Sequence, residues 1–236
     1  MSVLQARRAL RGGWTFSPRQ VSGLRLWLDA SMIAGLVDGD QVAAWYDLSG
    51  AGNHAVQATA AARPLYKTGI LNGRPVVRFD GSDDYLQTAA FSAALSQPNT
   101  VVVVGSFGAS GDTLYDGLAV GARHALVRSA ATTVGIIAPT YLSYTDATPT
   151  GTSVWSAVFN GGSSQLWRGG TSKASGAAGA HQLTGLTLGA DYRAPAAADN
   201  LLGDIAELLV YNASLSAADR QRIERYLGAK YGIAVA

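Results

Sequence analysis

The sequence predicts an all-β protein, an antiparallel sandwich of two β-sheets with one α-helix at the C-terminal end. Three observations predict it. Short segments of alternating or β-branched apolar residues follow one another from Leu24 to Val210. Clusters of Gly, Asn, Asp and Ser separate these segments, and the chain has 28 Gly among its 236 residues. A helical period of apolar residues stands out only near the C-terminus.

The first predicted strand, residues 24–29, is covered on both faces. Side chains of a strand point alternately to its two faces. The alternation therefore places Leu24, Leu26 and Leu28 on one face and Trp27 on the other. All four side chains are apolar, so we expect both faces of this strand to be buried.

Further strands follow the same reasoning. Residues 75–80 alternate, with Val77 and Phe79 on one face. Residues 100–104 are β-branched throughout, which predicts a central strand buried on both faces. Alternating segments on either side of a glycine turn predict a hairpin over 153–168. The remaining predicted strands are 186–189 and 205–211.

One amphipathic helix is predicted over residues 216–231. Ser216 is a good N-cap, and Gly232 can adopt the left-handed conformation that ends a helix. Ile223 and Leu227 lie on one face at helical spacing. We expect that face to pack against the sandwich.

Composition argues against several classes of protein. The net charge is +2 and charged residues make up 14% of the chain, so nucleic acid is not an expected partner. The chain has no Cys, which excludes disulfides and thiolate metal sites. No apolar run approaches the roughly 20 residues of a membrane helix. The N-terminal segment lacks the apolar stretch of a secretory signal.

A basic arm is expected ahead of the domain. The first 28 residues contain five arginines and no acidic residue. Residues 1–22 are predicted to form the arm, and residues 23–236 the domain. The arm is either a solvated tail or, through Arg7, Arg8 and Arg11, a contact with an acidic patch of a larger assembly.

Two blocks of sequence resemble the concanavalin A-like, laminin-G-like jelly-roll superfamily. The first combines residues 45–55 (WYDLSGAGNHA) with residues 72–86 (NGRPVVRFDGSDDYL). The second is residues 203–216 (GDIAELLVYNASLS), which is similar to the closing strand and turn of that family. The resemblance spans residues 24–232 and implies a lectin-like sandwich. It is specific for the fold and weak for function.

The acidic turn within the first block has two interpretations. Asp80, Asp83 and Asp84 are three carboxylates within five residues, and carboxylate oxygens are the ligands that calcium prefers. Asp and Gly are also good turn residues without any metal. We favour a structural turn and no cofactor, with a calcium site as the alternative.

No catalytic carboxylate pair is evident. Glycoside hydrolysis needs two carboxyl groups on either side of the bond that is cleaved. The chain has only two Glu, Glu207 and Glu224, which fall on a strand and on the helix. Asp204 lies three positions from Glu207, a spacing that places the two on opposite faces of a regular strand. We therefore expect no enzymatic activity.

Aromatic side chains suggest where a glycan would bind, because sugar rings stack on aromatic faces. Trp27, Trp45 and Trp155 fall in predicted strands and are expected in the core. Trp167, next to Arg168 and a glycine-rich turn, is the best candidate for an exposed aromatic residue.

Three functions remain open at this stage. The resemblance favours a non-catalytic bacteriophage virion protein, such as a capsid decoration, head-fibre or tail component. It would be made without a signal peptide and would bind other virion proteins and copies of itself. The alternative is a lectin-like module that recognises cell-surface glycans. An atypical glycosidase is the third and least favoured.

Overall fold

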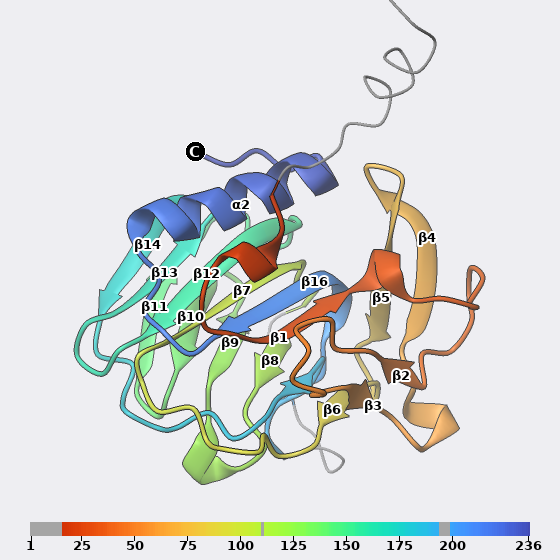
Figure 1. Cartoon of the computed structure of the whole chain (residues 1–236), viewed down its shortest axis with the longest axis horizontal. Helices are drawn as coiled ribbons and strands as arrows, with labels where there is room; N and C mark the ends of the chain where they lie inside the picture. Colours follow the sequence, from red (N-terminus) through yellow and green to blue (C-terminus); the bar gives the residue numbers. More distant parts are fainter. Residues whose placement is uncertain (1–15, 110, 194–198) are drawn as a thin grey trace, which may run out of the picture.

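The computed structural model describes residues 16–109, 111–193 and 199–236. These residues form two antiparallel eight-stranded sheets that face each other, with one long helix outside one of them (Figure 1). The predicted sandwich with a C-terminal helix is confirmed. Arg7, Arg8 and Arg11 lie outside the described residues, so the assembly contact of the arm stays a prediction. None of the helices in the described ranges is both long and apolar enough to cross a membrane.

We call the sheet under the helix the helix-side sheet and the other the open sheet. The helix-side sheet has the order β14-β13-β12-β7-β16-β5-β4, and β1 also pairs with β16. The open sheet has the order β11-β10-β9-β8-β15-β6-β3-β2. The strands of the helix-side sheet are β1 (Leu24–Asp29), β4 (Leu65–Leu71), β5 (Arg74–Asp80), β7 (Asn99–Gly105), β12 (Ser153–Phe159), β13 (Ser164–Arg168), β14 (Thr171–Gly176) and β16 (Leu202–Tyr211).

The open sheet and the helical turns complete the described chain. The strands of the open sheet are β2 (Ala44–Trp45), β3 (Ala55–Val56), β6 (Leu86–Thr88), β8 (Thr113–Asp116), β9 (Ala125–Ala130), β10 (Thr133–Ile137), β11 (Tyr141–Thr145) and β15 (Thr187–Leu188). The helices are the 3₁₀ turns η1 (Pro18–Gln20), η2 (Ala30–Met32), η3 (Ala60–Ala62) and η4 (Val120–Ala122), and the α-helix α2 (Ala217–Tyr231).

Two hydrophobic clusters hold these layers together. The larger lies between the sheets and contains Trp45 and Trp155, which are 1% and 0% exposed, as predicted for core residues. Strand β7 contributes to both clusters, because Val101 and Val103 face the interior while its other valines face the helix. This is the central strand that the run of valines predicts.

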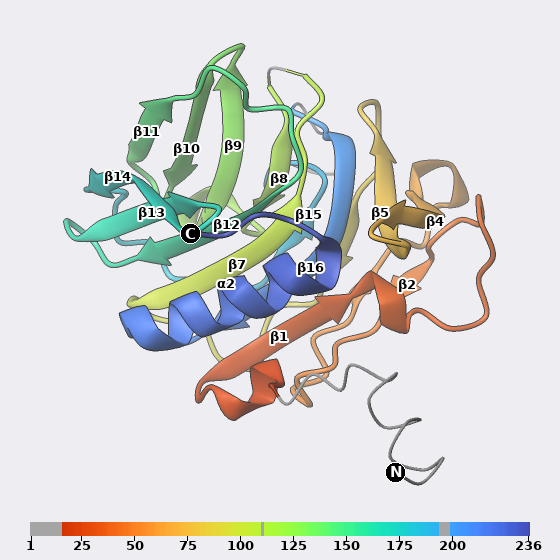
Figure 2. The same cartoon turned by 90° about the horizontal axis from the view of Figure 1, so that it is seen from above.

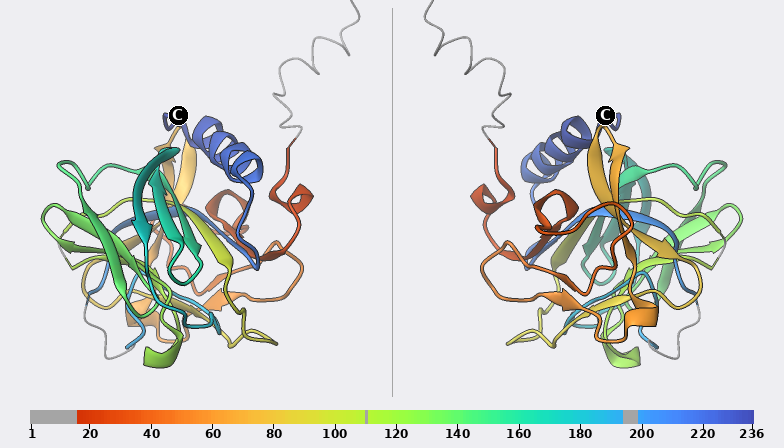
Figure 3. Two further views of the ribbon diagram at one scale, coloured as in Figure 1. Left: turned by 90° about the vertical axis from the view of Figure 1, so that its left-hand side faces the viewer. Right: turned by 90° about the vertical axis from the view of Figure 1, so that its right-hand side faces the viewer.

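Helix α2 is held by the smaller cluster. It crosses the outer face of the helix-side sheet, over β7 and beside β1 (Figures 2 and 3). Ile223 and Leu227 are fully buried there. Burial of each such side chain contributes about 1.5–3 kcal/mol. The predicted caps are also present: the Ser216 hydroxyl accepts a hydrogen bond from the Asp219 amide, and Gly232 has φ of 68°.

A β-bulge changes one predicted face of β1. Leu24 pairs with Tyr211 and Leu26 with Val210, so Arg25 is an extra residue on this strand. Leu26 therefore faces the interior, as predicted, whereas Leu24 packs on the helix side. The prediction that Leu24 shares a face with Leu26 was wrong, because strict alternation fails at a bulge.

The last residues of the predicted arm pack on the domain. Phe16 meets the ring of Tyr226 edge-on, with 5.5 Å between centroids. The Pro18 carbonyl accepts a hydrogen bond from the buried hydroxyl of Tyr211, and Val21 is 4% exposed. Residues 16–22 thus cover part of the helix-side layer.

Candidate functional site

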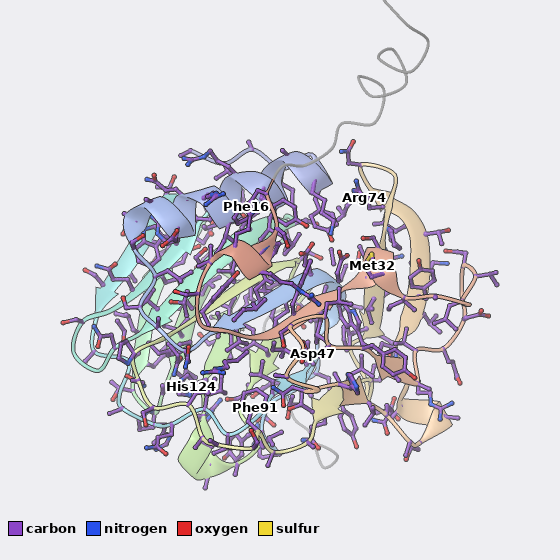
Figure 4. All side chains as sticks on the ribbon, viewed as in Figure 1. Phe16, Met32, Asp47, Arg74, Phe91 and His124 are labelled. Carbon is purple, nitrogen blue, oxygen red and sulfur yellow. The ribbon has the colours of Figure 1, made fainter. Side chains whose placement is uncertain are left out.

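A pocket of about 340 Å³ opens where β1, the start of β5 and the C-terminal end of α2 meet. We call it the Trp27 pocket. Figure 4 shows Met32 and Arg74 on this side of the molecule. Its lining includes the side chains of Arg19, Trp27, Met32, Arg74, Tyr226 and Lys230.

Local structure explains why these side chains converge. Trp27 points to the helix side of β1 because Leu26 and Leu28 on either side of it face the interior. Tyr226 projects from α2, and Arg74 is the first residue of β5. Both aromatic rings are half-buried, so each keeps a surface that a ligand can contact.

A buried ionic cluster supports the pocket from below. The Lys230 ammonium lies 2.5 Å from Oδ2 of Asp29 and 2.6 Å from Oε2 of Glu207. Tyr231 donates a hydrogen bond from its hydroxyl to Oε2 of Glu207 at 2.9 Å. The Trp27 indole N–H donates to the other carboxylate oxygen of Glu207 at 2.7 Å. The cluster thereby fixes the ring of Trp27 and the end of α2 against β1 and β16.

Burial changes the acid–base behaviour of this cluster. Burial of Glu207, reinforced by the negative charge of Asp29, raises the pKa of its carboxyl group to about 7. Lys230 opposes this change but does not cancel it. Burial is also the main reason that the pKa of Tyr231 is raised. Glu207 therefore gains or loses a proton near neutral pH, a feature common at functional sites.

A loop centred on Asp47 forms one wall of the pocket. The Asp47 carboxylate accepts hydrogen bonds from the backbone amides of Trp27, Ser49 and Asn53, at 2.8–3.0 Å. The carbonyl of Leu48, within this loop, accepts hydrogen bonds from the guanidinium of Arg19. The conspicuous polar residues of the first sequence block are therefore explained as turn formers that attach the loop to β1.

A second pocket, of about 470 Å³, lies on the other side of this loop. Polar side chains from both sequence blocks meet there. Asn53 donates its side-chain N–H to the carbonyl of Arg25 at 2.8 Å. The Asn212 amide oxygen accepts hydrogen bonds from the Arg25 guanidinium at 2.7 and 3.2 Å, in the amide orientation that satisfies both partners. Phe91, also part of the lining, is almost fully buried and leaves little surface for stacking.

Trp167 and Arg168 both contact other side chains of the protein. Trp167 is half-buried, and the guanidinium of Arg220 lies 4.2 Å from the centre of its ring. Arg168 forms an ion pair with Asp146 and lies over the ring of Trp155. Trp167 is thus less exposed than expected, because α2 covers it. Neither residue lines the Trp27 pocket, and their glycan role stays a prediction.

The acidic turn brings Asp80, Asp83 and Asp84 together. One carboxylate oxygen from each lies within 4.8 Å of the others. Asp84 accepts a hydrogen bond from the Asp80 amide, and Asp80 accepts one from Ser82. Burial, followed by the charge of Asp80, raises the pKa of Asp84 to about 6. Hydrogen bonds within the turn account for its shape, and calcium binding stays untested.

A bulge also corrects the predicted orientation of Glu207. Ile205 pairs with Gly105 and Glu207 with Val104, so Ala206 is an extra residue on β16. Asp204 is paired with Arg78 on the helix side of the sheet. Glu207 lies on this same side, beside Lys230, whereas a regular strand would place the two acids on opposite faces.

Two carboxylates do converge, but on an ammonium group. Asp29 and Glu207 come from paired positions on β1 and β16, and Lys230 bridges them. Glu207 is fully buried. Asp29 also lines the Trp27 pocket, whereas Glu207 is not among its lining residues. Both carboxylates are paired with the Lys230 ammonium and hold α2 in place, an arrangement that differs from the free acid and base of a glycosidase.

The Trp27 pocket is not apparent from the sequence. A tryptophan in a strand is expected in the core, yet the ring of Trp27 is half-buried at a pocket. The available signal was Asp29, two positions after Trp27 and therefore on the same face of the strand. A buried acid requires a cationic or hydrogen-bonding partner.

Comparisons with known proteins identify the fold. No family model matches the sequence, and no curated protein matches it. The binding domain of botulinum neurotoxin serotype D, solved with N-acetylneuraminic acid, is 13% identical with a TM-score of 0.61. The receptor-binding domain of the botulinum neurotoxin C/D mosaic serotype is 12% identical, with a TM-score of 0.63. Each match covers 86% of this chain and 51% of the toxin domain, so the chain spans about half the length of these domains.

A sialidase from Trypanosoma rangeli, solved with sialic acid, is also similar. It is 15% identical with a TM-score of 0.54, and the match covers 89% of this chain and 33% of the sialidase. At these identities the likeness concerns the fold alone. The protein thus has the antiparallel two-sheet β-sandwich fold, with one C-terminal helix.

Proposed function

We propose that the protein is a carbohydrate-binding module and that the Trp27 pocket is its glycan site. The observation that carries this proposal is the presence of two half-buried aromatic side chains, Trp27 and Tyr226, in one pocket with guanidinium donors. Apolar faces of sugar rings pack on aromatic rings, and sugar hydroxyls accept hydrogen bonds from arginine.

The rigidity of the site also supports binding. The hydrogen bond from Trp27 to Glu207 fixes the indole, and the ionic cluster fixes the helix that carries Tyr226. A site that is ordered before the ligand arrives loses less entropy on binding. The structural neighbours solved with N-acetylneuraminic acid and sialic acid lend further support to a carbohydrate ligand for a sandwich of this kind.

A glycan array with the purified protein tests the proposal. We expect a signal for at least one glycan, and we expect Tyr226→Leu to reduce it strongly. Tyr46→Leu is the matched control, because Tyr46 is 65% exposed and lies outside the pocket. No signal on the array, or an equal loss in both variants, would reject the proposed site.

Trp167→Ala separates the pocket from the site expected from sequence. If the pocket binds the glycan, this variant keeps the signal. If the signal disappears in folded Trp167→Ala and survives in Tyr226→Leu, the glycan site lies at Trp167 instead.

A bacteriophage structural role stays a prediction from the sequence, together with binding to other virion proteins and to copies of itself. It is compatible with glycan binding, because a virion protein can also contact host sugars. Co-purification with assembled particles tests it. Release of sugars from polysaccharides tests the glycosidase alternative.

A further inference from the structure

We infer that the Trp27 pocket selects acidic sugars and binds their carboxylate or sulfate group through Arg19 and Arg74. This inference rests on the proposed function, because it names the class of glycan that the same pocket takes. The sugar ring would pack on the aromatic walls while the two arginines contact the anionic group.

The charges of the pocket lead to this inference. Three basic side chains line the pocket, those of Arg19, Arg74 and Lys230. Lys230 is paired with two buried carboxylates, those of Glu207 and of Asp29, and Asp29 is the one acidic residue among those that line the pocket. In contrast, Arg19 and Arg74 form no ion pair with any carboxylate of the described residues. Their positive charges are therefore available to a ligand.

Arg74 is held in place by one nitrogen of its guanidinium group. Its Nε donates a hydrogen bond to the carbonyl of Lys230 at 3.1 Å, near the end of α2. Its two terminal nitrogens have no hydrogen-bond partner in the described part of the chain. Arg74 is also close enough to Tyr226 for its charge to favour the phenolate, although burial, the larger effect, raises the pKa of Tyr226. The guanidinium thus lies near the aromatic wall, with its orientation fixed by the helix end.

Arg19, in η1, is also held by hydrogen bonds to a backbone carbonyl. Its Nε and one terminal nitrogen donate to the carbonyl of Leu48, in the Asp47 loop. The remaining terminal nitrogen has no partner among the residues that the structure describes. Guanidinium groups form charge-assisted hydrogen bonds with carboxylate and sulfate oxygens, which are about twice as strong as neutral ones.

The second pocket lacks this combination. The guanidinium of Arg25 is bonded there to the Asn212 amide, and no half-buried aromatic face accompanies it. An acidic sugar therefore fits the Trp27 pocket, where unneutralised guanidinium groups and aromatic surface occur together.

Calorimetric titration with matched sugars tests the inference. D-Galactose, D-galacturonic acid and galactose 6-sulfate have the same ring and differ at C6, which carries a neutral hydroxyl, a carboxylate or a sulfate. We expect one of the acids to bind at least about tenfold more tightly than galactose, the value of one charge-assisted hydrogen bond. This preference should decrease as salt rises from about 0.02 to about 0.5 M, because ions screen exposed charges.

Substitutions at Arg74 assign the preference to the pocket. Arg74→Met should lower the affinity for the acidic sugar at least about tenfold and should change the affinity for galactose by less than about threefold. Arg74→Lys keeps the charge and should restore part of the preference. Arg78→Met is the matched control, because Arg78 lies on the same strand, pairs with Asp204 and is outside the pocket.

The outcomes separate this inference from the proposed function. If galactose or another neutral sugar binds the pocket as tightly as the acids, the inference is wrong and the proposed function stands. If Arg74→Met and Arg78→Met reduce acid binding equally, the arginine assignment is wrong. If no sugar binds at all, both fail.

Discussion

The ammonium of Lys230 lies 2.6 Å from Oε2 of Glu207, and both side chains are buried. This contact joins the last turn of α2 to β16, which lies between β7 and β5 in the helix-side sheet. Asp29 on β1 completes the cluster from the other side. Three chain segments thus meet at one point under the Trp27 pocket, so the stability of the helix and the geometry of the pocket depend on the same charges.

Removal of Lys230 should destabilise the fold strongly. Lys230→Met leaves two buried carboxylates without their cation, a change that costs about 3–5 kcal/mol in comparable pairs. Lys67→Met is the control, because Lys67 and Asp38 form a partly exposed pair whose charges are screened by water, so its loss should change stability little. Urea denaturation measures both. Equal losses would show that the buried cluster is not what holds α2.

Glu207 should make stability fall as the pH rises through neutrality. Its pKa is raised to about 7 in the folded protein, so the folded state binds a proton that the unfolded state has released. By linkage, the stability from this group is present at acid pH and lost as pH rises through 7. The loss from pH 6 to pH 8 amounts to about 1 kcal/mol, or about 2–4 °C in Tm for a chain of this size.

The comparison with Glu207→Gln isolates this contribution. Other groups also respond in this range: burial lowers the pKa of His124 to about 3, and that group acts in the opposite direction. Glu207→Gln cannot titrate at this position, so the difference in Tm between it and the wild type should change with pH. A constant difference from pH 6 to pH 8 would contradict the raised pKa.

A charge placed under α2 should unfold part of the molecule. Ile223→Asp or Leu227→Asp would bury a carboxylate against the valines of β7 and should cost a few kcal/mol. Arg225→Asp is the control, because residue 225 is exposed on the same helix, and it should change stability by less than about 1 kcal/mol. Thermal unfolding followed by circular dichroism measures the effect. A wild-type Tm for Leu227→Asp would mean that the helix does not pack as described.

Calcium should not change the thermal stability of the protein if the acidic turn keeps its conformation without a metal ion. Hydrogen bonds from Ser82 and Asp80 backbone amides already account for its conformation. We therefore expect the same Tm in calcium and in EDTA. An increase in calcium that Asp83→Asn abolishes would instead identify Asp80, Asp83 and Asp84 as a metal site, because a ligand that binds the folded state raises its stability.

Much of the fold could be predicted from local patterns. The valines of β7, the alternation of β5 and the hairpin of β12 and β13 all follow from the requirement that apolar side chains be buried on a known face. The limits of α2 follow from Ser216 and Gly232, whose side chain and backbone satisfy the ends of the helix. These features depend on residues close in sequence.

The candidate site was less accessible to the same reasoning. Two bulges, at Arg25 and at Ala206, turn Leu24 and Glu207 to the helix side, and neither bulge has a clear local signature. Trp27 alternates with two buried leucines in its strand, and the only local sign that it differs from a core residue is Asp29, two positions further along. The pocket forms only because the start of β5, the end of α2 and the Asp47 loop come together around it.

Residues close together in the sequence specify the class of fold, its central strands and the helix that closes it, because burial and capping act over a few residues. Which charged groups meet depends on the packing of distant segments. Lys230 reaches Asp29 across 201 positions of the chain, and such a contact depends on how strands pair and where the helix crosses them. The same long-range packing places Arg19 and Arg74 beside two aromatic rings, with no carboxylate partner among the residues that the structure describes.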